Sequence, residues 1–436
     1  MKPLFLTLLC TLYFFVLPAV AEVPEVALPK ELTLDQAVAI FRKNGYDLLI
    51  ADANIRQAEG DLRSARGIQN PILVGLGIGK TFGYDASQCS GCSDIQYNAS
   101  ISDSATIVDL FAAKRIFRSK AADLALKATR LGKQDAERQL VSLLKQQFVR
   151  TKLAQMNVDL TQQFYDSIVK TFDLITKRFK AGAISEADVA RMDVARLAAA
   201  QAVDVAIQNH GANQANLVYL LGARHFTGKL ILLGTLDHPV APSSLKDTSK
   251  DALLEIALQN RPDLRAARFL RIRAKHSLTS ARLEWFPDLI WSLNYVSEGT
   301  GQQAITPPTL SMGLSIPLPT IGKTSGDVIK AKAGLYIQDL TLAKATAQVV
   351  SDIDTGWIIY ERAQLRIERM ETSLLKQASR AKDLVTLQYQ KGAASLLDFL
   401  DAERTYISTN SDHIQTLSDY WTAVFQLEQA IGKELS

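Results

Sequence analysis

The stretch RFKAGAISEADV, residues 178–189, recurs later in the chain as QYQKGAASLLDF, residues 388–399. Both copies read aromatic, two residues, Gly, two residues, Ser, two residues, Asp. Glycine suits the C-terminal cap of a helix, where φ is positive, and Ser-x-x-Asp suits the capping box that starts the next helix. The doubled phrase therefore predicts a tight turn that reverses a helix, once in each half of the chain.

The helices on either side of these turns are expected to be very long. No proline occurs between Pro71 and Pro239 or after Pro319, and apolar residues recur at steps of three and four. A helix of this kind spans roughly 100 Å at 1.5 Å per residue, too long for a globular core, so the helices must pack side by side. The pattern predicts two long helices and two return helices, over about 112–180, 186–222, 323–390 and 396–433.

The beginning of each half is also repeated. A shift of 216 residues places 35–71 on 251–287 without a gap, with 12 of 37 positions identical. A repeat of this length predicts a duplicated structural unit. Each unit is expected to open with a pair of shorter helices, in which Asp47 and Asp263 cap the second helix. The predicted helices cover 33–44, 47–69, 250–260 and 263–285.

Two β-hairpins are predicted between the short and the long helices. Apolar residues alternate with polar or small residues in IQYNASIS (95–102) and TLSMGLSI (309–316), and ILVGLGIG (72–79) and LIWSLNYV (289–296) are their partners. The hairpins span 72–103 and 289–317, so the chain has four strands. Each hairpin would have one apolar face and one polar or small face.

The N-terminus reads as a signal peptide. Lys2 precedes an apolar run that ends in Ala19-Val20-Ala21, a small-residue cleavage site. Export favours a disulfide between Cys89 and Cys92 over a metal or redox site, because the five histidines lie elsewhere in the sequence. The net charge of +4 with scattered basic residues predicts no nucleic-acid partner.

No catalytic or cofactor motif is present. The Gly-Lys-Thr of GLGIGKT (75–81) lacks the earlier glycine and the following helix of a phosphate-binding loop. We therefore expect neither an enzyme nor a bound cofactor or metal. Asp398 and Asp401 lie three residues apart on one predicted helix, and from the residues alone a capping and solvated role is the simpler interpretation.

The strands point to the outer membrane. No segment after the signal approaches 18 apolar residues, whereas alternating strands in an exported protein are typical of outer-membrane barrels, which need about eight strands or more. Four strands per chain then imply that two or three copies share one barrel. The predicted fold is mainly α with a small β part. Its segments are a signal peptide (1–21), a first repeat (22–224), a linker (225–249) and a second repeat (250–436).

In this order the motifs resemble those of the TolC-like outer membrane efflux proteins over essentially the whole mature chain. The resemblance rests on the LTLDQAVAIFRKNGYDL opening, the hairpin exit LSIPLP, the two turn phrases and the ending LDFLDAERTYIS. It implies a homotrimer in the outer membrane, with a shared β-barrel standing on a periplasmic α-helical barrel. Such a trimer is the exit duct for an inner-membrane pump and a periplasmic adaptor.

The resemblance also assigns roles to residues. The two turns would dock the adaptor, and the aspartates of LLDFLDA (396–402) would form a constriction at the inner mouth. Where the family's best-known member has an arginine that locks the closed tip, this chain has Ala394, so another pair must hold the closed state. The alternative is a secreted coiled-coil adhesin or scaffold. The residues with assigned roles are Gly182, Ser185, Asp188, Gly392, Ser395 and Asp398 for docking, and Asp398 and Asp401 for the constriction.

Overall fold

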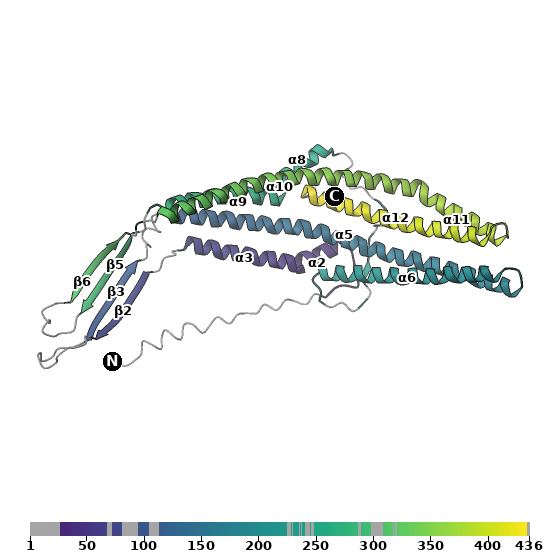
Figure 1. Cartoon of the computed structure of the whole chain (residues 1–436), viewed down its shortest axis with the longest axis horizontal. Helices are drawn as coiled ribbons and strands as arrows, with labels where there is room; N and C mark the ends of the chain where they lie inside the picture. The colour runs from purple at the N-terminus through teal and green to yellow at the C-terminus, as the bar shows by residue number, and fades with distance from the viewer. Residues whose placement is uncertain are drawn as a thin grey trace.

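The protein is elongated, with a sheet at one end and helical turns at the other (Figure 1). The computed structural model describes residues 27–67, 72–80, 95–103, 113–224, 248–286, 289–297, 308–316 and 321–433, with Leu318 and short pieces between 228 and 245. The predicted signal peptide and the pair Cys89 and Cys92 lie outside the described residues.

Each half of the chain begins with two shorter helices that meet at a corner. α2 (Leu34–Asn44) and α3 (Tyr46–Arg66) form the first pair, and α8 (Lys250–Asn260) and α9 (Pro262–Leu283) form the second. These bounds lie within three residues of the predicted ones. α3 packs along α5 and α9 packs along both α5 and α10, so these helices thicken the part of the molecule next to the sheet.

The prediction that Asp47 and Asp263 cap the second helix of each pair is wrong. The capping positions are Gly45 and Arg261, whose backbones are nearly the same, with φ −59° and ψ 121° and with φ −59° and ψ 123°. Each aspartate lies inside the first turn, where the helix dipole favours a negative charge. Pro262 takes the first helical position, which its fixed φ suits, and this shifts the helix start one residue earlier.

The two predicted hairpins are confirmed, and they join into one antiparallel sheet. The strands are β2 (Ile72–Lys80), β3 (Ile95–Asp103), β5 (Ile290–Ser297) and β6 (Thr309–Ser315), in the order β2-β3-β5-β6. β3 pairs with β5 in register, so the sheet links the two halves of the chain. β2 and β6 are the edge strands of this sheet.

The sheet has one apolar face and one face of small and polar residues. Val74, Ile101, Leu293 and Met312 are aligned across the four strands, and the next aligned row on the same face is Leu76, Ala99, Tyr295 and Leu310. On the opposite face, the row between them is Gly75, Ser100, Asn294 and Ser311. Leu76 is 83% exposed and Met312 is 80% exposed in the single chain. A contiguous apolar surface of this kind marks a region that contacts lipid or another protein.

The long helices follow the prediction closely. α5 (Ala113–Lys180) leads into α6 (Glu186–Leu220), as expected. In the second half, the long helix is interrupted by a π-helical turn, which the sequence analysis did not predict. This long helix consists of α10 (Ile321–Arg369), the π turn η3 (Met370–Leu374) and α11 (Leu375–Gln390). The return helix is α12 (Leu396–Ile431).

The return helices end in the middle of the molecule, against the corners of the short helix pairs. Gly222, two residues after the end of α6, and Gly432, directly after the end of α12, both have positive φ. A Cβ on Gly222 would overlap the backbone of Asn44, and a Cβ on Gly432 would lie 3.2 Å from Cγ of Arg261. Glycine is therefore needed at these positions for both conformation and space.

The structure also contains a small parallel ribbon that the sequence did not predict. β1 (Glu31–Leu32) pairs with β4 (Ile231–Leu232), which lies in the predicted linker. Nζ of Lys152 in α5 donates to the carbonyl of Leu232 at 2.6 Å, and Nε1 of Trp421 in α12 donates to the carbonyl of Leu236 at 3.0 Å. The linker is thus held against both long helical hairpins.

Candidate functional site

The first turn connects α5 to α6 at the end of the molecule away from the sheet. Gly182 has φ +75°, as predicted for a helix C-cap. Oγ of Ser185 accepts from the backbone N–H of Asp188 at 3.2 Å, and the Ser185 hydroxyl donates to Oδ2 of Asp188 at 2.8 Å. The serine therefore caps α6, as the sequence predicts.

The second turn, from α11 to α12, has the same design in a more complete form. Gly392 has φ +78°. Oγ of Ser395 accepts from the N–H of Asp398 at 3.2 Å, and the N–H of Ser395 donates to Oδ2 of Asp398 at 3.0 Å. The hydrogen bonds from the Ser395 hydroxyl and backbone hold the pKa of Asp398 below its ordinary value.

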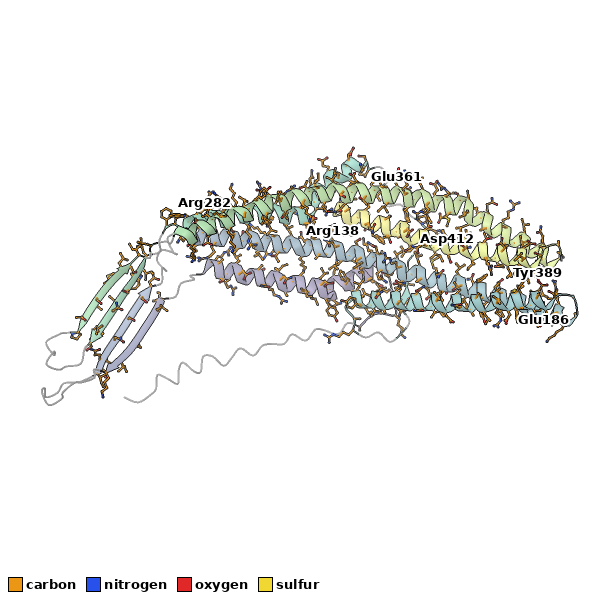
Figure 2. All side chains as sticks on the ribbon, viewed as in Figure 1. Arg138, Glu186, Arg282, Glu361, Tyr389 and Asp412 are labelled. Carbon is orange, nitrogen blue, oxygen red and sulfur yellow. The ribbon has the colours of Figure 1, made fainter. Side chains whose placement is uncertain are left out.

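The surface of both turns is open. A Cβ built on Gly182 or on Gly392 would have no other atom within 4 Å, apart from its own neighbours in the chain. Glu186 beside the first turn and Tyr389 beside the second mark the two turns in Figure 2, where both lie at the distal end of the molecule. The turns are therefore accessible to a partner approaching along the long axis.

The two turns pack on each other through an apolar cluster. Ile168, Ile175 and Met192 belong to the helical hairpin formed by α5 and α6. They pack with Tyr389, Phe399 and Leu400 of the helical hairpin formed by α11 and α12. Ile184 and Ala394, which belong to the turns themselves, pack against this cluster. Ala394, where the resemblance led us to look for a charged lock, is thus an apolar contact.

The aromatic residue of the second turn phrase has a role that the sequence analysis missed. The ring of Tyr389 stacks on Phe399, with a centroid distance of 5.1 Å, and the Arg178 guanidinium lies 5.8 Å from the centre of the Tyr389 ring. Burial raises the pKa of Tyr389, and Asp188 also raises it, whereas Arg178 lowers it. Arg178, Asp188 and Tyr389 therefore connect the two turns.

Asp398 and Asp401 are both exposed, on the side of α12 opposite the buried Phe399 and Leu400. In the single chain their carboxylates face solvent. Both carboxylates therefore lie on the exposed side of the first turns of α12, next to the second turn.

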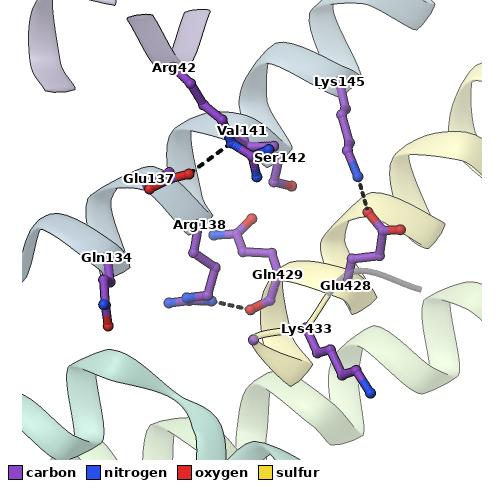
Figure 3. A pocket seen from close by; sticks show the side chains of 11 residues that line it. Arg42, Gln134, Glu137, Arg138, Val141, Ser142, Lys145, Glu428, Gln429 and Lys433 are labelled. Carbon is purple, nitrogen blue, oxygen red and sulfur yellow. Dashed lines mark hydrogen bonds and ion pairs between the residues drawn. The ribbon is translucent and has the colours of Figure 1, made fainter. Parts of the chain in front are cut away.

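A polar cavity of about 190 Å³ lies at the junction in the middle of the molecule (Figure 3). Arg42 of α2 pairs with Glu137 at 2.8 Å, and Lys145 of α5 pairs with Glu428 of α12 at 2.8 Å. Arg138 donates to the backbone carbonyl of Gln429. These pairs join α2, α5 and α12, so the cavity reads as a structural junction.

A second set of charges lies beside it. Arg261 is 3% exposed and pairs with Asp263 at 2.7 Å and with Asp352 at 2.6 Å. Its Nη1 also lies 3.4 Å from the carbonyl of Ala430, near the end of α12. Burial opposes ionisation of Asp263, but hydrogen bonding and attraction from Arg261 outweigh it and lower the pKa.

The described residues contain neither a metal-binding group nor a membrane-spanning helix. None of their His, Cys, Asp and Glu side chains form a group that could hold a metal ion. None of the helices there is both long enough and apolar enough to cross a membrane.

Comparison with known proteins gives a consistent result. Residues 253–433 match the model of the family described as "Outer membrane efflux protein". The cobalt-zinc-cadmium resistance protein CzcC of Cupriavidus metallidurans is 24% identical, covering 92% of this chain and 90% of that protein. The solvent efflux pump outer membrane protein SrpC of Pseudomonas putida is 23% identical, covering 93% of this chain and 87% of that protein.

The fold is also that of a solved outer membrane protein. The structure of VceC from Vibrio cholerae superposes with a TM-score of 0.73 at 18% identity, covering 92% of this chain and 97% of that one. At this level of identity, the likeness concerns the fold.

Proposed function

We propose that this chain, which belongs to the outer membrane efflux proteins of the TolC family, forms the exit duct through which a tripartite export system releases its substrates. The protein lies in the outer membrane, with its helices in the periplasm. One observation carries the proposal: an exposed apolar sheet face at one end of the chain and a pair of accessible helical turns at the other. A duct across the envelope needs one end that contacts the membrane and another end that partner proteins can reach.

The sheet suits a shared barrel. Four strands are too few to close a barrel, and the edge strands β2 and β6 would be exposed to unwanted pairing. In a trimer, β6 of one copy would pair with β2 of the next, and three sets of four strands would close a barrel of twelve. The apolar face, which carries both Leu76 and Met312, would then face lipid, and the face with Gly75 and Ser100 would face the lumen.

The helices would continue this barrel as a tube into the periplasm. α5 and α6 of one half and α11 and α12 of the other form two hairpins that reach the same distal end. In a trimer, six turns would surround the inner mouth. We propose that a periplasmic adaptor docks there, at Gly182, Ser185 and Asp188 and at Gly392, Ser395 and Asp398, and that it couples the duct to an inner-membrane pump.

The aspartates of the second turn are proposed to line the mouth. Asp398 and Asp401 from three copies would place six carboxylates around the axis. Rings of this kind favour cations in other pores. Because the names of the relatives range from metal resistance to solvent efflux, we infer that the duct conducts what its pump delivers.

The test is reconstitution of the purified protein. We expect a trimer that dissociates only on heating in detergent and that gives stable, uniform conductance steps in planar bilayers. A monomer, or a trimer without conductance, would refute the duct. That outcome would favour the adhesin or scaffold predicted as the alternative, which the relatives do not support and which leaves the apolar sheet unexplained.

A further inference from the structure

A buried carboxyl group lies between the two helical hairpins, close to the distal turns. Glu403 of α12 is 5% exposed, although it lies only two residues beyond the exposed Asp401. Its Oε1 is 3.5 Å from the hydroxyl of Ser167 in α5. Glutamate is rarely buried to this degree unless it is paired, so its position requires an explanation.

The neighbours of Glu403 provide little compensation for a negative charge. From α5 it faces the neutral hydroxyl of Ser167, and from α11 the charged groups that act on it are Lys382 and Asp383. Nζ of Lys382 lies 4.2 Å from the centre of the Tyr406 ring and 3.7 Å from Oδ1 of Asp383. The nearby cation is therefore shared with other partners.

Glu403 lies where its protonation state can affect how the two helical hairpins pack near the distal turns. Glu403 lies at the sheet-side end of the apolar cluster that packs α11 and α12 against α5 and α6. The next polar contact between α12 and α5 toward the sheet joins Ser411 to Asn157 at 3.3 Å. Widening the mouth must separate α12 from α5 along this interface, and the separation would bring Glu403 into contact with water.

We propose that Glu403 is a proton-operated switch of the inner mouth, whose neutral form stabilises the packed arrangement of the two hairpins and whose ionised form favours their separation. This inference rests on the proposed duct. It assigns to the distal end a control that is separate from the aspartates of the turn.

The direction of the effect follows from burial. Desolvation raises the pKa of Glu403 in the packed arrangement, against the smaller lowering effects of Lys382 and Ser167. Once exposed, the carboxyl group returns toward its ordinary pKa. The stabilisation of the packed arrangement is therefore fully present at low pH and is lost as the pH rises through the raised pKa. Each pKa unit that separates the two arrangements changes their ratio about tenfold per copy.

The experiment compares the wild-type trimer with Glu403→Gln and with Glu361→Gln in planar bilayers between pH 5 and 8. Glutamine keeps the size of the side chain and remains neutral, and Glu361 is an exposed glutamate of α10 that serves as the matched control. We expect the open probability of the wild type and of Glu361→Gln to rise with pH by tenfold or more. We expect Glu403→Gln to stay low over the whole range.

Comparing the pH dependence of the variants removes the contribution of other titrating groups. One such group is His413 of α12, whose Nε2 lies 3.6 Å from Oε1 of Glu371 in η3. If no protein conducts, the duct itself is refuted. If all three conduct with the same pH dependence, the duct stands and the switch is refuted.

Hydrogen exchange at pH 7.5 provides a second readout that does not depend on conductance. Glu403→Gln should slow exchange about tenfold or more in the segments around Ser167 and Glu403, whereas Glu361→Gln should not change it. Equal or faster exchange in a trimeric Glu403→Gln variant would overturn the proposal.

Discussion

The two halves of the chain have similar backbone conformations at their turns and corners, and they differ in the charged side chains that they carry there. At the corner of the short helices, Gly45 and Arg261 have almost the same φ and ψ. In the first half, the end of α6 lies against the backbone of this corner. In the second half, the same place holds a buried arginine between two aspartates. The conformation is thus set by the helix corner, and the side chain is free to take a different role.

The distal turns show the same relation. Both have a glycine with positive φ and a serine cap, but only the second has the reciprocal hydrogen bond of a complete capping box. The second half also has the exposed Asp401, the buried Glu403 and the π turn. We infer that the first half mainly supports the wall and that the second half carries the chemistry of the mouth.

The largest effect is expected from a charge on the turns. Gly182→Glu and Gly392→Glu should each reduce export to background while the trimer still reaches the outer membrane, because a charged side chain would project into the docking surface. Gly182→Ala and Gly392→Ala are the controls, since they share the strain of positive φ without the bulk. Export can be measured as resistance to the substrate of the cognate pump. Normal export by both glutamate variants would remove the docking role from the turns.

The next effect concerns the buried arginine that distinguishes the second corner. Arg261→Met should lower the free energy of unfolding by about 3 kcal/mol, because Asp263 and Asp352 would lose the cation between them. Urea unfolding followed by circular dichroism measures this loss. Arg271→Met, which breaks an exposed pair with Asp339, is the control and should cost about 1 kcal/mol or less.

The same pair predicts a pH dependence. Because the pKa of Asp263 is lowered in the folded protein, its stabilisation is present above the ordinary aspartate pKa of about 3.9 and is lost as the pH falls through the lowered value. The difference between wild type and Arg261→Met should therefore shrink in acid. A difference that stays constant from pH 7 to pH 3 would contradict the assigned role of the pair.

A smaller effect separates the two helix ends at the junction. Gly222→Ala and Gly432→Ala should each cost about 1–2 kcal/mol for placing a side chain at positive φ. Gly222→Ala should cost more, since its Cβ would overlap the backbone oxygen of Asn44, whereas the Cβ of Gly432→Ala would lie 3.2 Å from Cγ of Arg261. The midpoints of urea unfolding provide the comparison. Equal losses would show that the two junctions do not differ in this way.

The smallest effect concerns the caps. Ser185→Ala and Ser395→Ala should each destabilise the start of the following helix by about 1 kcal/mol, with the larger loss at Ser395, where the complete box is broken. Hydrogen exchange in the first turns of α6 and α12 measures this directly. Ser408→Ala, at an exposed position within α12, should leave both turns unchanged.

Most of the helices and strands could be predicted because the patterns that specify them are local. Helical periodicity, proline-free runs and alternating strands located α5, α12 and the hairpins, and the repeated phrase located both turns. The caps at 47 and 263 were predicted wrongly because an aspartate in a first turn resembles a cap. The starts of these helices are set by Gly45, which is the N-cap of α3, and by Pro262, which is the first residue of α9.

What could not be predicted depends on contacts between distant segments. The pairing of β1 with β4 involves only two residues from each strand, too few to leave a periodic signal. The burial of Arg261 and of Glu403 follows from the packing of α12 on helices that lie far away in the sequence. Glu403 follows two exposed aspartates on the same helix, and only the structure separates its environment from theirs.

The most direct test of the duct is ion selectivity at its inner mouth. Single-channel recordings in planar bilayers would compare the wild type with an Asp398→Ala/Asp401→Ala double variant, with a trivalent cation added to one side at a time. We predict that the wild type is cation-selective and is blocked from the helical side, and that the double variant loses both properties while remaining a trimer. Unchanged selectivity and unchanged block in the double variant would contradict the account and leave Asp398 only its role in capping α12.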